Sequence, residues 1–436
     1  MPRWLYFLLI FAVLAPVVDA LHVHAAVLFI VAGLGIVPLA GLIGQSVEQV
    51  AEHTGERIGG LLFATFGNAT ELIIGIFALN AGLVDVVRAS IIGSILGNAL
   101  LVLGVSTCIG SIKHGRLRFE TRPASQYASL LALCIGGLLL PTFAELLASH
   151  NHQTQIMERG ATLSDFIAVL LLAGYLASIL FSVFRVGDTP ATDEPDQLDV
   201  VLGARSESAI VRLLAYRRHV VKSGAPGKTD VLRQIDNTLH TIVKHETGQY
   251  DTQASDSAPP PLPEAPTVPI APIAKSKEVS ETKPSLWLAL LCLVVATAGV
   301  AVLSEILVGS IEPLTRALGW NTAFVGLIFV PLIGGIPEYF NTISMALDKR
   351  MEMVLAASAG SSIQIALLIA PILVLASLFA PQRLDLVFSI VELAVLGLTT
   401  FLFSEITGDG ELVWLEGLLL ILLYAMMGGT VFLFGA

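Results

Sequence analysis

Two short stretches of this sequence decide its fold: residues 67–71 read Gly-Asn-Ala-Thr-Glu, and residues 334–338 read Gly-Gly-Ile-Pro-Glu. Each stretch lies inside a long apolar run and ends on a carboxylate. A Gly-Ser pair, at 93–94 and at 360–361, begins 22 residues after the carboxylate in both cases. The shared spacing indicates that the chain contains an internal repeat.

The composition around these stretches is that of a membrane protein. Of the 436 residues, 55% are hydrophobic and 14% are charged, whereas average proteins carry roughly a quarter charged residues. A soluble domain of this length could not cover its core with so few charges. The net charge of −11, without a basic cluster, argues against a nucleic-acid partner. Cys108, Cys134 and Cys292 lie far apart in apolar runs, so we expect packing residues and no disulfide or metal site.

A helix needs about 20 mainly apolar residues to cross a bilayer. Eleven such runs predict an all-α polytopic membrane protein with about eleven transmembrane helices. The runs lie at 4–20, 25–47, 58–82, 87–111, 124–148, 162–185, 286–309, 322–346, 352–379, 384–404 and 412–435. Glycines inside the runs, such as Gly93, Gly97 and Gly104, are expected to permit close packing between helices.

The first run has two interpretations. Arg3, a short apolar stretch and the residues Val-Asp-Ala at 18–20 suit either a retained helix or a cleaved signal peptide. The topology of the remaining runs is the same in both cases.

A long polar segment at 188–284 divides the spans after the first into five and five. Because five is odd, the second half must enter the membrane the other way up, and inverted repeats of this kind are typical of secondary transporters. We therefore divide the chain into an extra N-terminal helix (1–23), a first five-helix repeat (24–187), a cytoplasmic linker (188–284) and a second five-helix repeat (285–436). The excess of Lys and Arg in loops on one side predicts a cytoplasmic N-terminus. Short loops and the lack of organelle signals favour a bacterial inner membrane, with an organelle membrane as the alternative.

Glu71 and Glu338, the carboxylates of the two motifs, are the central candidate residues. A carboxylate in a bilayer core costs a few kcal/mol, and it is tolerated if it binds a cation, carries a proton, or does each in turn. Two carboxylates that the repeat brings together repel each other when ionised, and a divalent cation that binds between them displaces protons. Competition between cation and proton at one site is the minimal chemistry of an antiporter.

Neighbouring side chains offer the remaining oxygen ligands. Hard cations such as Ca²⁺ take about six to eight oxygens, and the lack of an accompanying set of His and Cys disfavours zinc and copper. The candidate ligands are Asn68, Thr70, Ser94, Asn98, Ser361, Ser362 and Gln364. Glu305 and Glu312 are candidates for an ion path or proton relay, since they lie in or near the seventh span.

Residues 67–74, Gly-Asn-Ala-Thr-Glu-Leu-Ile-Ile, resemble the first signature motif of the calcium/proton exchanger family, in the cation/calcium exchanger superfamily. The resemblance covers nearly all of the chain outside the linker, with further matching stretches at 36–40, 304–313, 360–366 and 414–417. It implies eleven helices, proton-driven Ca²⁺ export or sequestration, and central roles for Glu71 and Glu338. Ca²⁺ would be the transported substrate, with no cofactor, and the other partners would be protons and the lipid bilayer. The oligomeric state stays open.

The second motif departs from the family pattern, which usually reads Gly-Asn-Ala-Ala-Glu-His. Gly335 stands in place of the amide ligand and Tyr339 in place of the histidine. Asn341, one turn after Glu338, is a candidate to replace the amide. The departure bears on ion selectivity and proton coupling, and not on the fold.

Three other functions remain as alternatives. A Na⁺ or K⁺/proton antiporter on the same fold is the first, because the altered second motif lowers the demand for a divalent ion. An intramembrane enzyme is disfavoured, since the sequence has no His-Glu-x-x-His, no Gly-x-Ser-x-Gly and no paired intramembrane aspartates. A channel is disfavoured because paired acids at broken helices suit alternating access better.

Overall fold

The structure is a computed structural model, and it describes residues 3–54, 59, 61–62, 65–150, 160–182 and 285–434. The linker expected at 188–284 lies outside these residues. The described elements are almost all helical, in this order: η1 (Arg3–Leu8), α1 (Leu9–Ala20), α2 (Ala25–Thr54), α4 (Ala69–Asn80), α5 (Val84–Leu96), η2 (Gly97–Val102), α6 (Leu103–His114), β1 (Leu117–Arg118), α7 (Thr121–His150), α9 (Gly160–Ser182), α13 (Leu286–Leu318), α14 (Thr322–Phe324), η3 (Val325–Phe329), α15 (Val330–Gly334), α16 (Ile336–Leu347), α17 (Met351–Gln364), η4 (Ile365–Ile369), α18 (Ala370–Ala376), η5 (Ser377–Phe379), α19 (Ile390–Gly408), β2 (Glu411–Leu412) and α20 (Trp414–Phe434).

The membrane class is confirmed. Within the described ranges, eight helical stretches are long and apolar enough to cross a bilayer, and α14–α15 with α16 meet the same criterion only as a pair, which bends by 58°. Two shorter apolar helices, Leu5–Ala20 and Ala69–Asn80, add to these. The total of eleven spans stays a prediction.

The two halves repeat the same local structure around each glutamate. α4 and α16 are both 12 residues long, and Glu71 and Glu338 are each the third residue of their helix. α5 and α17 each begin 13 residues after that glutamate and run into a π-helical segment, η2 or η4. π-helical insertions are frequent at functional sites. The repeat inferred from short motifs therefore extends to whole helices.

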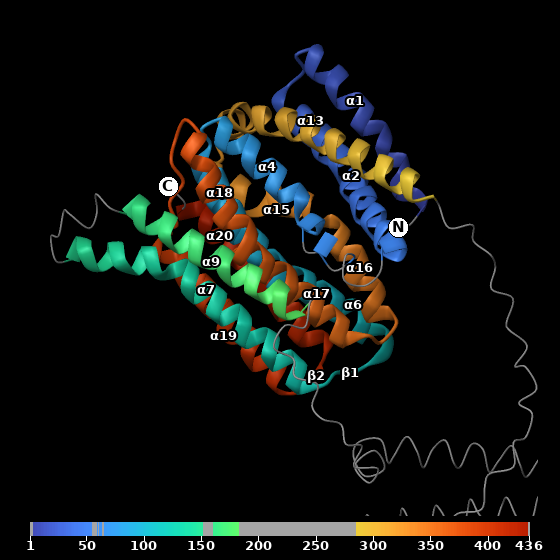
Figure 1. Cartoon of the computed structure of the whole chain (residues 1–436), viewed down its shortest axis with the longest axis vertical. Coiled ribbons are helices and arrows are strands. Elements are labelled where there is room, and N and C mark those ends of the chain that lie inside the picture. Colours follow the sequence, from blue (N-terminus) through green and yellow to red (C-terminus); the bar gives the residue numbers. More distant parts are fainter. Residues whose placement is uncertain are drawn as a thin grey trace, which may run out of the picture. The chain divides into compact units, whose positions relative to one another are not determined.

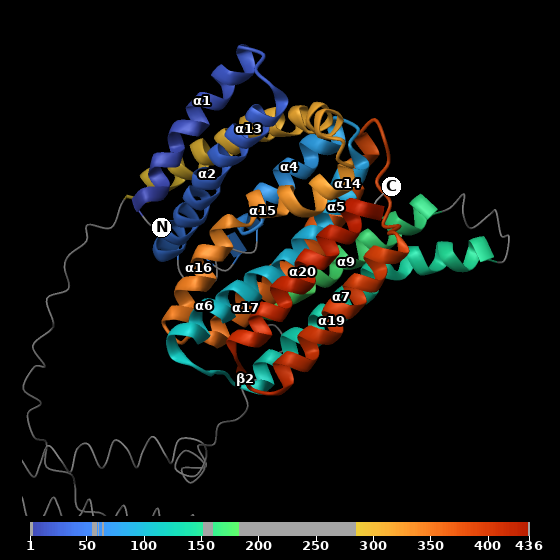
Figure 2. The same ribbon diagram turned by 180° about the vertical axis from the view of Figure 1, so that it is seen from behind.

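Helices α1, α2 and α13 lie along one side of the bundle, and α7, α9 and α19 lie on the opposite side (Figures 1 and 2). Between them lie α4, α15 and α16, which carry the two motifs. α2 packs closely on its neighbours at Gly35, where a Cβ atom would lie 2.9 Å from Leu303 of α13 and from the backbone of Ala12 in α1. Small residues in membranes permit such close helix contacts.

Two of the glycines expected to permit close packing act in this way. A Cβ at Gly93 of α5 would collide with the Leu327 carbonyl of η3, and a Cβ at Gly104 of α6 would lie 2.8 Å from the Gly417 carbonyl of α20. The packing prediction is wrong for Gly97, since no atom lies within 4 Å of the point that a Cβ atom would occupy and the residue lines a cavity. Cys108, Cys134 and Cys292 are free in the structure.

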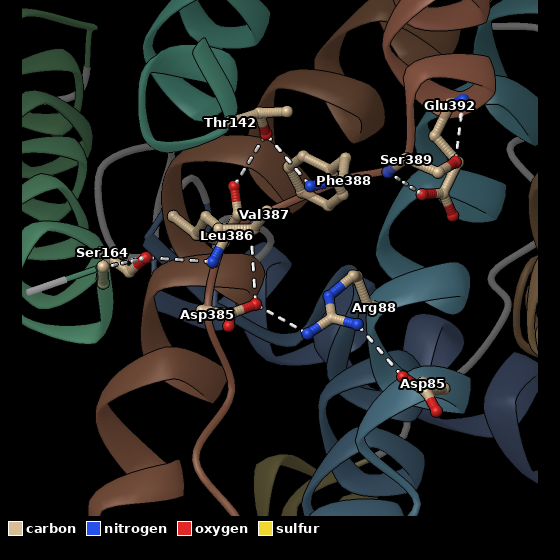
Figure 3. Close-up of polar contacts among 11 residues, drawn as sticks. Asp85, Arg88, Thr142, Ser164, Asp385, Leu386, Val387, Phe388, Ser389 and Glu392 are labelled. Atoms are coloured by element: carbon tan, nitrogen blue, oxygen red, sulfur yellow. Dashed lines mark hydrogen bonds and ion pairs between the residues drawn. The ribbon is translucent and has the colours of Figure 1, made fainter. Parts of the chain in front are cut away.

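The predicted span 384–404 does not begin as a helix. Residues 383–389 are non-helical, and α19 starts only at Ile390, after Ser389 caps it with a capping box to Glu392 (Figure 3). Side chains of the first half satisfy the non-helical backbone: the Thr142 hydroxyl donates to the Leu386 carbonyl at 3.1 Å and accepts from the Phe388 N–H at 3.0 Å. Non-helical backbone at membrane depth requires such partners in the protein.

Ion pairs and a short sheet also join the halves. Arg88 of α5 donates to Asp385 at 2.6 Å and to Asp85 at 3.0 Å (Figure 3). β1 and β2 pair antiparallel, with Leu117 opposite Leu412. Each half therefore completes polar or backbone contacts of the other.

Candidate cation and proton site

Both glutamates lie in the first turn of a short helix that follows a break in the chain. Residues 67–68 form a turn before α4, and Gly335 separates α15 from α16 at the 58° bend. The positive end of a helix dipole favours a carboxylate at this position. Neither helix carries a basic residue in its last turn. Gly67, Gly335 and Pro337 are residue types that favour such helix breaks. The breaks place the two acidic side chains inside the bundle.

The glutamates lie against each other's repeat. A Cβ on Gly334, four residues before Glu338, would lie 3.0 Å from Oε1 of Glu71. The two carboxyl groups are close enough to interact electrostatically. Oε2 of Glu338 is buried and has no hydrogen-bond partner in the described part of the chain. Buried carboxylate oxygens normally have a hydrogen-bond partner, so this oxygen is available to bind one.

A cavity of about 270 Å³ lies beside Glu338. Five of the polar residues predicted from the sequence line this cavity: Thr70, Glu338, Asn341, Ser361 and Gln364. The rest of the lining is mainly small or apolar and comes from α2, the residues just before α4, the end of α15, α16 and α17: Ala40, Gly44, Val47, Phe66, Gly67, Gly334, Pro337, Thr342, Met345, Ala356, Ala357 and Gly360. A cavity with oxygen donors at one end can admit a hydrated cation.

A second and much smaller cavity, of about 10 Å³, lies beside Glu71. Its polar lining consists of Glu71, Ser94, Asn98, Tyr339 and Tyr424, and the other lining residues are Gly97, Pro331, Leu332 and Gly335. The two cavities share no lining residue. The glutamates therefore face separate spaces.

A hydrogen bond joins the two repeats beside the larger cavity, which Gln364 lines. Nδ2 of Asn68 donates to Oε1 of Gln364 at 2.7 Å. Oδ1 of Asn68 is buried and has no partner among the residues described. The bond fixes the orientation of the Asn68 amide. Its oxygen remains free to accept a hydrogen bond or to bind a cation.

Four predicted site residues line neither cavity: Asn68, described above, and Ser362, Glu305 and Glu312. Ser362 is fully buried, and its hydroxyl donates to the Ile95 carbonyl at 3.1 Å, so it joins α17 to α5. Glu305 is exposed on α13. Glu312 is exposed and pairs with Arg316 one turn later. Neither Glu305 nor Glu312 lines the cavities that hold the two central glutamates.

Tyr424 is a polar lining residue of the smaller cavity that the sequence analysis did not single out. It lies in the last span, 86 residues from Glu338, and no motif marks it. A polar phenol in an otherwise apolar run was the available signal. Among the described residues, no group of three or more His, Cys, Asp and Glu side chains gathers to hold a metal, so a cation here must rely on amide, hydroxyl and backbone oxygens beside two carboxylates.

The chain belongs to the sodium/calcium exchanger protein family, whose model matches residues 24–184 and 288–433. These two ranges include both motifs and leave out the linker. The family assignment fits the repeat of helices described above, and it confirms the resemblance found in the sequence.

Similar proteins cover nearly the whole chain. A Ca(2+)/H(+) antiporter of Synechocystis sp. is 34% identical over 92% of this chain and 89% of its own length. The Ca(2+)/H(+) antiporter ChaA of Bacillus subtilis is 30% identical over 95% and 94%. The structure of native YfkE superposes with a TM-score of 0.68, at 26% identity, over 98% of this chain and 99% of that one. The H+/Ca2+ exchanger CAX shares the fold, with a TM-score of 0.59 at 12% identity over 99% and 91%.

Proposed function

We propose that this protein is a secondary active antiporter that exchanges Ca²⁺ for protons across a membrane, and that it acts as a transporter and not as an enzyme. The observation that carries the proposal is the pair of facing repeats, with Glu71 of one beside Gly334 of the other. The names of the similar proteins, Ca(2+)/H(+) antiporters of two bacteria, support Ca²⁺ and protons as the exchanged ions.

The two glutamates bind the cation and protons in turn. With Ca²⁺ bound, both carboxylates are ionised and their mutual repulsion is offset by the divalent charge. When Ca²⁺ leaves, protons remove the repulsion. Thr70, Ser361 and Gln364 in the larger cavity, and Ser94 and Asn98 in the smaller one, supply neutral oxygens. Because a loaded carboxylate pair is neutralised in either case, the protein can change conformation with cation or protons bound, but not empty.

The larger cavity opens toward the cytoplasm in this proposal. Its lining reaches Val47 near the end of α2, Met345 near the end of α16 and Ala356 near the start of α17, which all lie toward loops expected on the cytoplasmic side. On the other side, α13 packs against α2 and α4. We infer from this that the chain is a multi-pass protein of a bacterial inner membrane with its N-terminus in the cytoplasm, and that an open larger cavity corresponds to its inward-open state.

A monovalent cation/proton antiporter is the second candidate, and one observation bears on it. Asn68 and Gly335 occupy equivalent positions in the two motifs, so only the first motif has an amide side chain at this position. However, Asn341 lines the larger cavity on the same helix as Glu338, so an amide oxygen is still available in the second repeat. The Ca²⁺ proposal is therefore favoured.

Uptake by proteoliposomes under an imposed proton gradient tests the proposal. Ca²⁺ uptake should be lost in Glu71→Gln and in Glu338→Gln, because neither amide can ionise. Glu392→Gln is the matched control, since Glu392 lies at the start of α19 and glutamine preserves a capping box. If the protein takes up Na⁺ or K⁺ but not Ca²⁺, the monovalent cation/proton antiporter replaces the Ca²⁺ proposal. Normal exchange by either glutamate variant would refute the assignment of Glu71 and Glu338 as the site.

A further inference from the structure

Helices α2 and α13 contact each other in a reciprocal way. A Cβ on Gly35 of α2 would lie 2.9 Å from Cδ1 of Leu303 in α13, and a Cβ on Gly299 of α13 would lie 2.9 Å from Cδ1 of Leu39 in α2. Gly299 follows Gly35 by 264 residues, and Leu303 follows Leu39 by the same number. The two helices are therefore equivalent elements of the two repeats, and this spacing identifies which residue of α13 corresponds to each residue of α2.

The equivalent residues have different surroundings. Three residues of α2 line the larger cavity: Ala40, Gly44 and Val47. Their counterparts in α13, at the same spacing, are all buried and line neither of the cavities beside the glutamates: Ser304, Val308 and Ile311. One stripe of residues therefore faces a cavity in the first repeat and is packed in the second.

The packing of the helices explains this difference. The larger cavity is lined by both α2 and α16, the helix that carries Glu338. At the equivalent place in the other repeat, α13 packs against α4, the helix that carries Glu71. Alternating access in inverted-repeat transporters moves one repeat or bundle against the other around a fixed site. We therefore expect α13 and α4 to separate when access changes sides, so that Ser304 takes the position that Ala40 has here.

The Ser304 hydroxyl is buried and has no hydrogen-bond partner in the described part of the chain. Helical serines and threonines can donate to a carbonyl of the preceding turn. The other three hydroxyl side chains of α13 do so: Thr297 to Leu293 at 2.7 Å, Ser310 to Leu307 at 2.6 Å and Thr315 to Glu312 at 2.9 Å. Since a buried hydroxyl without a partner costs free energy, Ser304 calls for a role that the closed contact does not supply.

We propose that Ser304 is a cation ligand in the state whose site is open to the face opposite the larger cavity, where its hydroxyl oxygen contacts Ca²⁺ beside Glu71. The inference rests on the proposed antiporter function. Hard cations bind oxygen ligands, and the side chain of Ala40, which occupies the equivalent position, offers none. The two open states therefore differ by one oxygen ligand, and the Ser304 contact strengthens Ca²⁺ binding from the opposite face alone.

Thiol labelling tests where residue 304 lies. Ser304→Cys is made in the full-length protein with its three native cysteines replaced, and a membrane-impermeant maleimide is added to one face or the other of oriented vesicles. Ala40→Cys should react from the face onto which the larger cavity opens, and Ser304→Cys only from the opposite face. Ser310→Cys is the matched control on the same helix. Because Ser310 is buried and its counterpart Ser46 does not line the cavity, this variant should react from neither face.

Ca²⁺ transport tests whether the hydroxyl binds the cation. In proteoliposomes of known orientation, the KM for Ca²⁺ is measured at each face. Ser304→Ala should raise the KM at the face opposite the larger cavity about fivefold, as for the loss of one neutral polar contact, and leave the KM at the other face unchanged. Ser310→Ala removes a hydroxyl that is bonded within its own helix and should change neither KM.

The outcomes separate this inference from the function on which it rests. A wild type that exchanges no Ca²⁺ contradicts the proposed function, whereas the labelling needs no Ca²⁺ and still decides where residue 304 lies. Reaction of Ser304→Cys from neither face, or from the same face as Ala40→Cys, overturns the inference. An unchanged KM at both faces in Ser304→Ala also overturns it, as does an equal rise at both, which indicates a packing role. If Ser304→Ala fails to fold, the labelling of Ser304→Cys decides.

Discussion

The amide of Asn68 donates a hydrogen bond of 2.7 Å to the side-chain oxygen of Gln364, and so the first motif is bonded to the second repeat beside both glutamates. Residues 296 positions apart in the chain thus depend on each other for their orientation. The bond leaves Oδ1 of Asn68 buried and without a partner in the described structure. The Asn68 amide therefore ties the two repeats together, and its oxygen stays buried and unbonded.

A double-mutant cycle measures this bond. Asn68→Ala and Gln364→Ala should each raise the KM for Ca²⁺, and the double variant should cost less than the sum, with a coupling energy of about 1 kcal/mol, as for residues in direct contact. The KM for Ca²⁺ in proteoliposomes is the measurement. Asn98→Ala with Gln364→Ala is the control pair, since these side chains are not bonded. Additive effects in the Asn68 pair would show that the bond does not position the site.

Gly334 keeps space for the Glu71 carboxylate. A Cβ there would lie 3.0 Å from Glu71 Oε1 and 3.1 Å from its carboxyl carbon, so alanine must displace the carboxylate. We expect Gly334→Ala to lower Ca²⁺ uptake at least tenfold, which corresponds to about 1.4 kcal/mol. Gly360 lines the same cavity and has no atom within 4 Å of its Cβ position, so Gly360→Ala should retain uptake. Equal losses in both variants would contradict the steric explanation.

The two acidic partners of Arg88 should differ in their contribution to stability. Asp385 is 36% exposed and Asp85 is 70% exposed, while Arg88 is 23% exposed. Since exposed ion pairs contribute little, Asp385→Asn should lower the free energy of unfolding by about 1 kcal/mol, and Asp85→Asn by less than about half of that. Thermal unfolding in detergent gives both values. A larger loss for Asp85→Asn would mean that the network in Figure 3 is not held mainly through Asp385.

Thr142 stabilises the non-helical segment before α19 through two hydrogen bonds, to the Leu386 carbonyl and from the Phe388 N–H. Thr142→Val preserves the shape of the side chain but leaves both buried backbone groups without this partner, so we expect a loss of about 2 kcal/mol in unfolding free energy. Thr400→Val is the control, since the Thr400 hydroxyl bonds only to Leu396 in its own helix, and it should have a small effect. Similar shifts in melting temperature for both variants would contradict the prediction.

The sequence predicted the class, the repeat and the two glutamates because each depends on long apolar runs or on fixed spacing. Spacing alone could not decide which of two adjacent serines faces the site: Ser361 lines the larger cavity, whereas Ser362 bonds to α5. Hydropathy also could not separate helical from non-helical backbone at 384–388, where Leu384, Leu386 and Phe388 are all apolar and buried. Tertiary partners, Thr142 and Ser164, satisfy backbone groups of Leu386 and Phe388 that a helix would have bonded internally.

The candidate relay residues show the same limit. Glu305 lies in a span, and an intramembrane acid indicates function by default, but the face of a helix that meets lipid or water cannot be read from a single sequence. Tyr424 is the opposite case, because it gains its position only when α20 packs beside α6 and η2. Sites assembled from distant helices are visible in the sequence only where a motif marks each contributor.

The reciprocal contacts between the halves have a consequence for how the protein is made. A ribosome produces the first half before the second, and at that stage Arg88, Thr142 and Ser164 have no Asp385 or non-helical segment to contact, while β1 has no β2. The nascent first half must therefore hold a charge and open hydrogen-bonding groups in or near the bilayer until translation is almost complete. During insertion of this chain, helices of the first half therefore complete their polar contacts only after helices of the second half have been inserted.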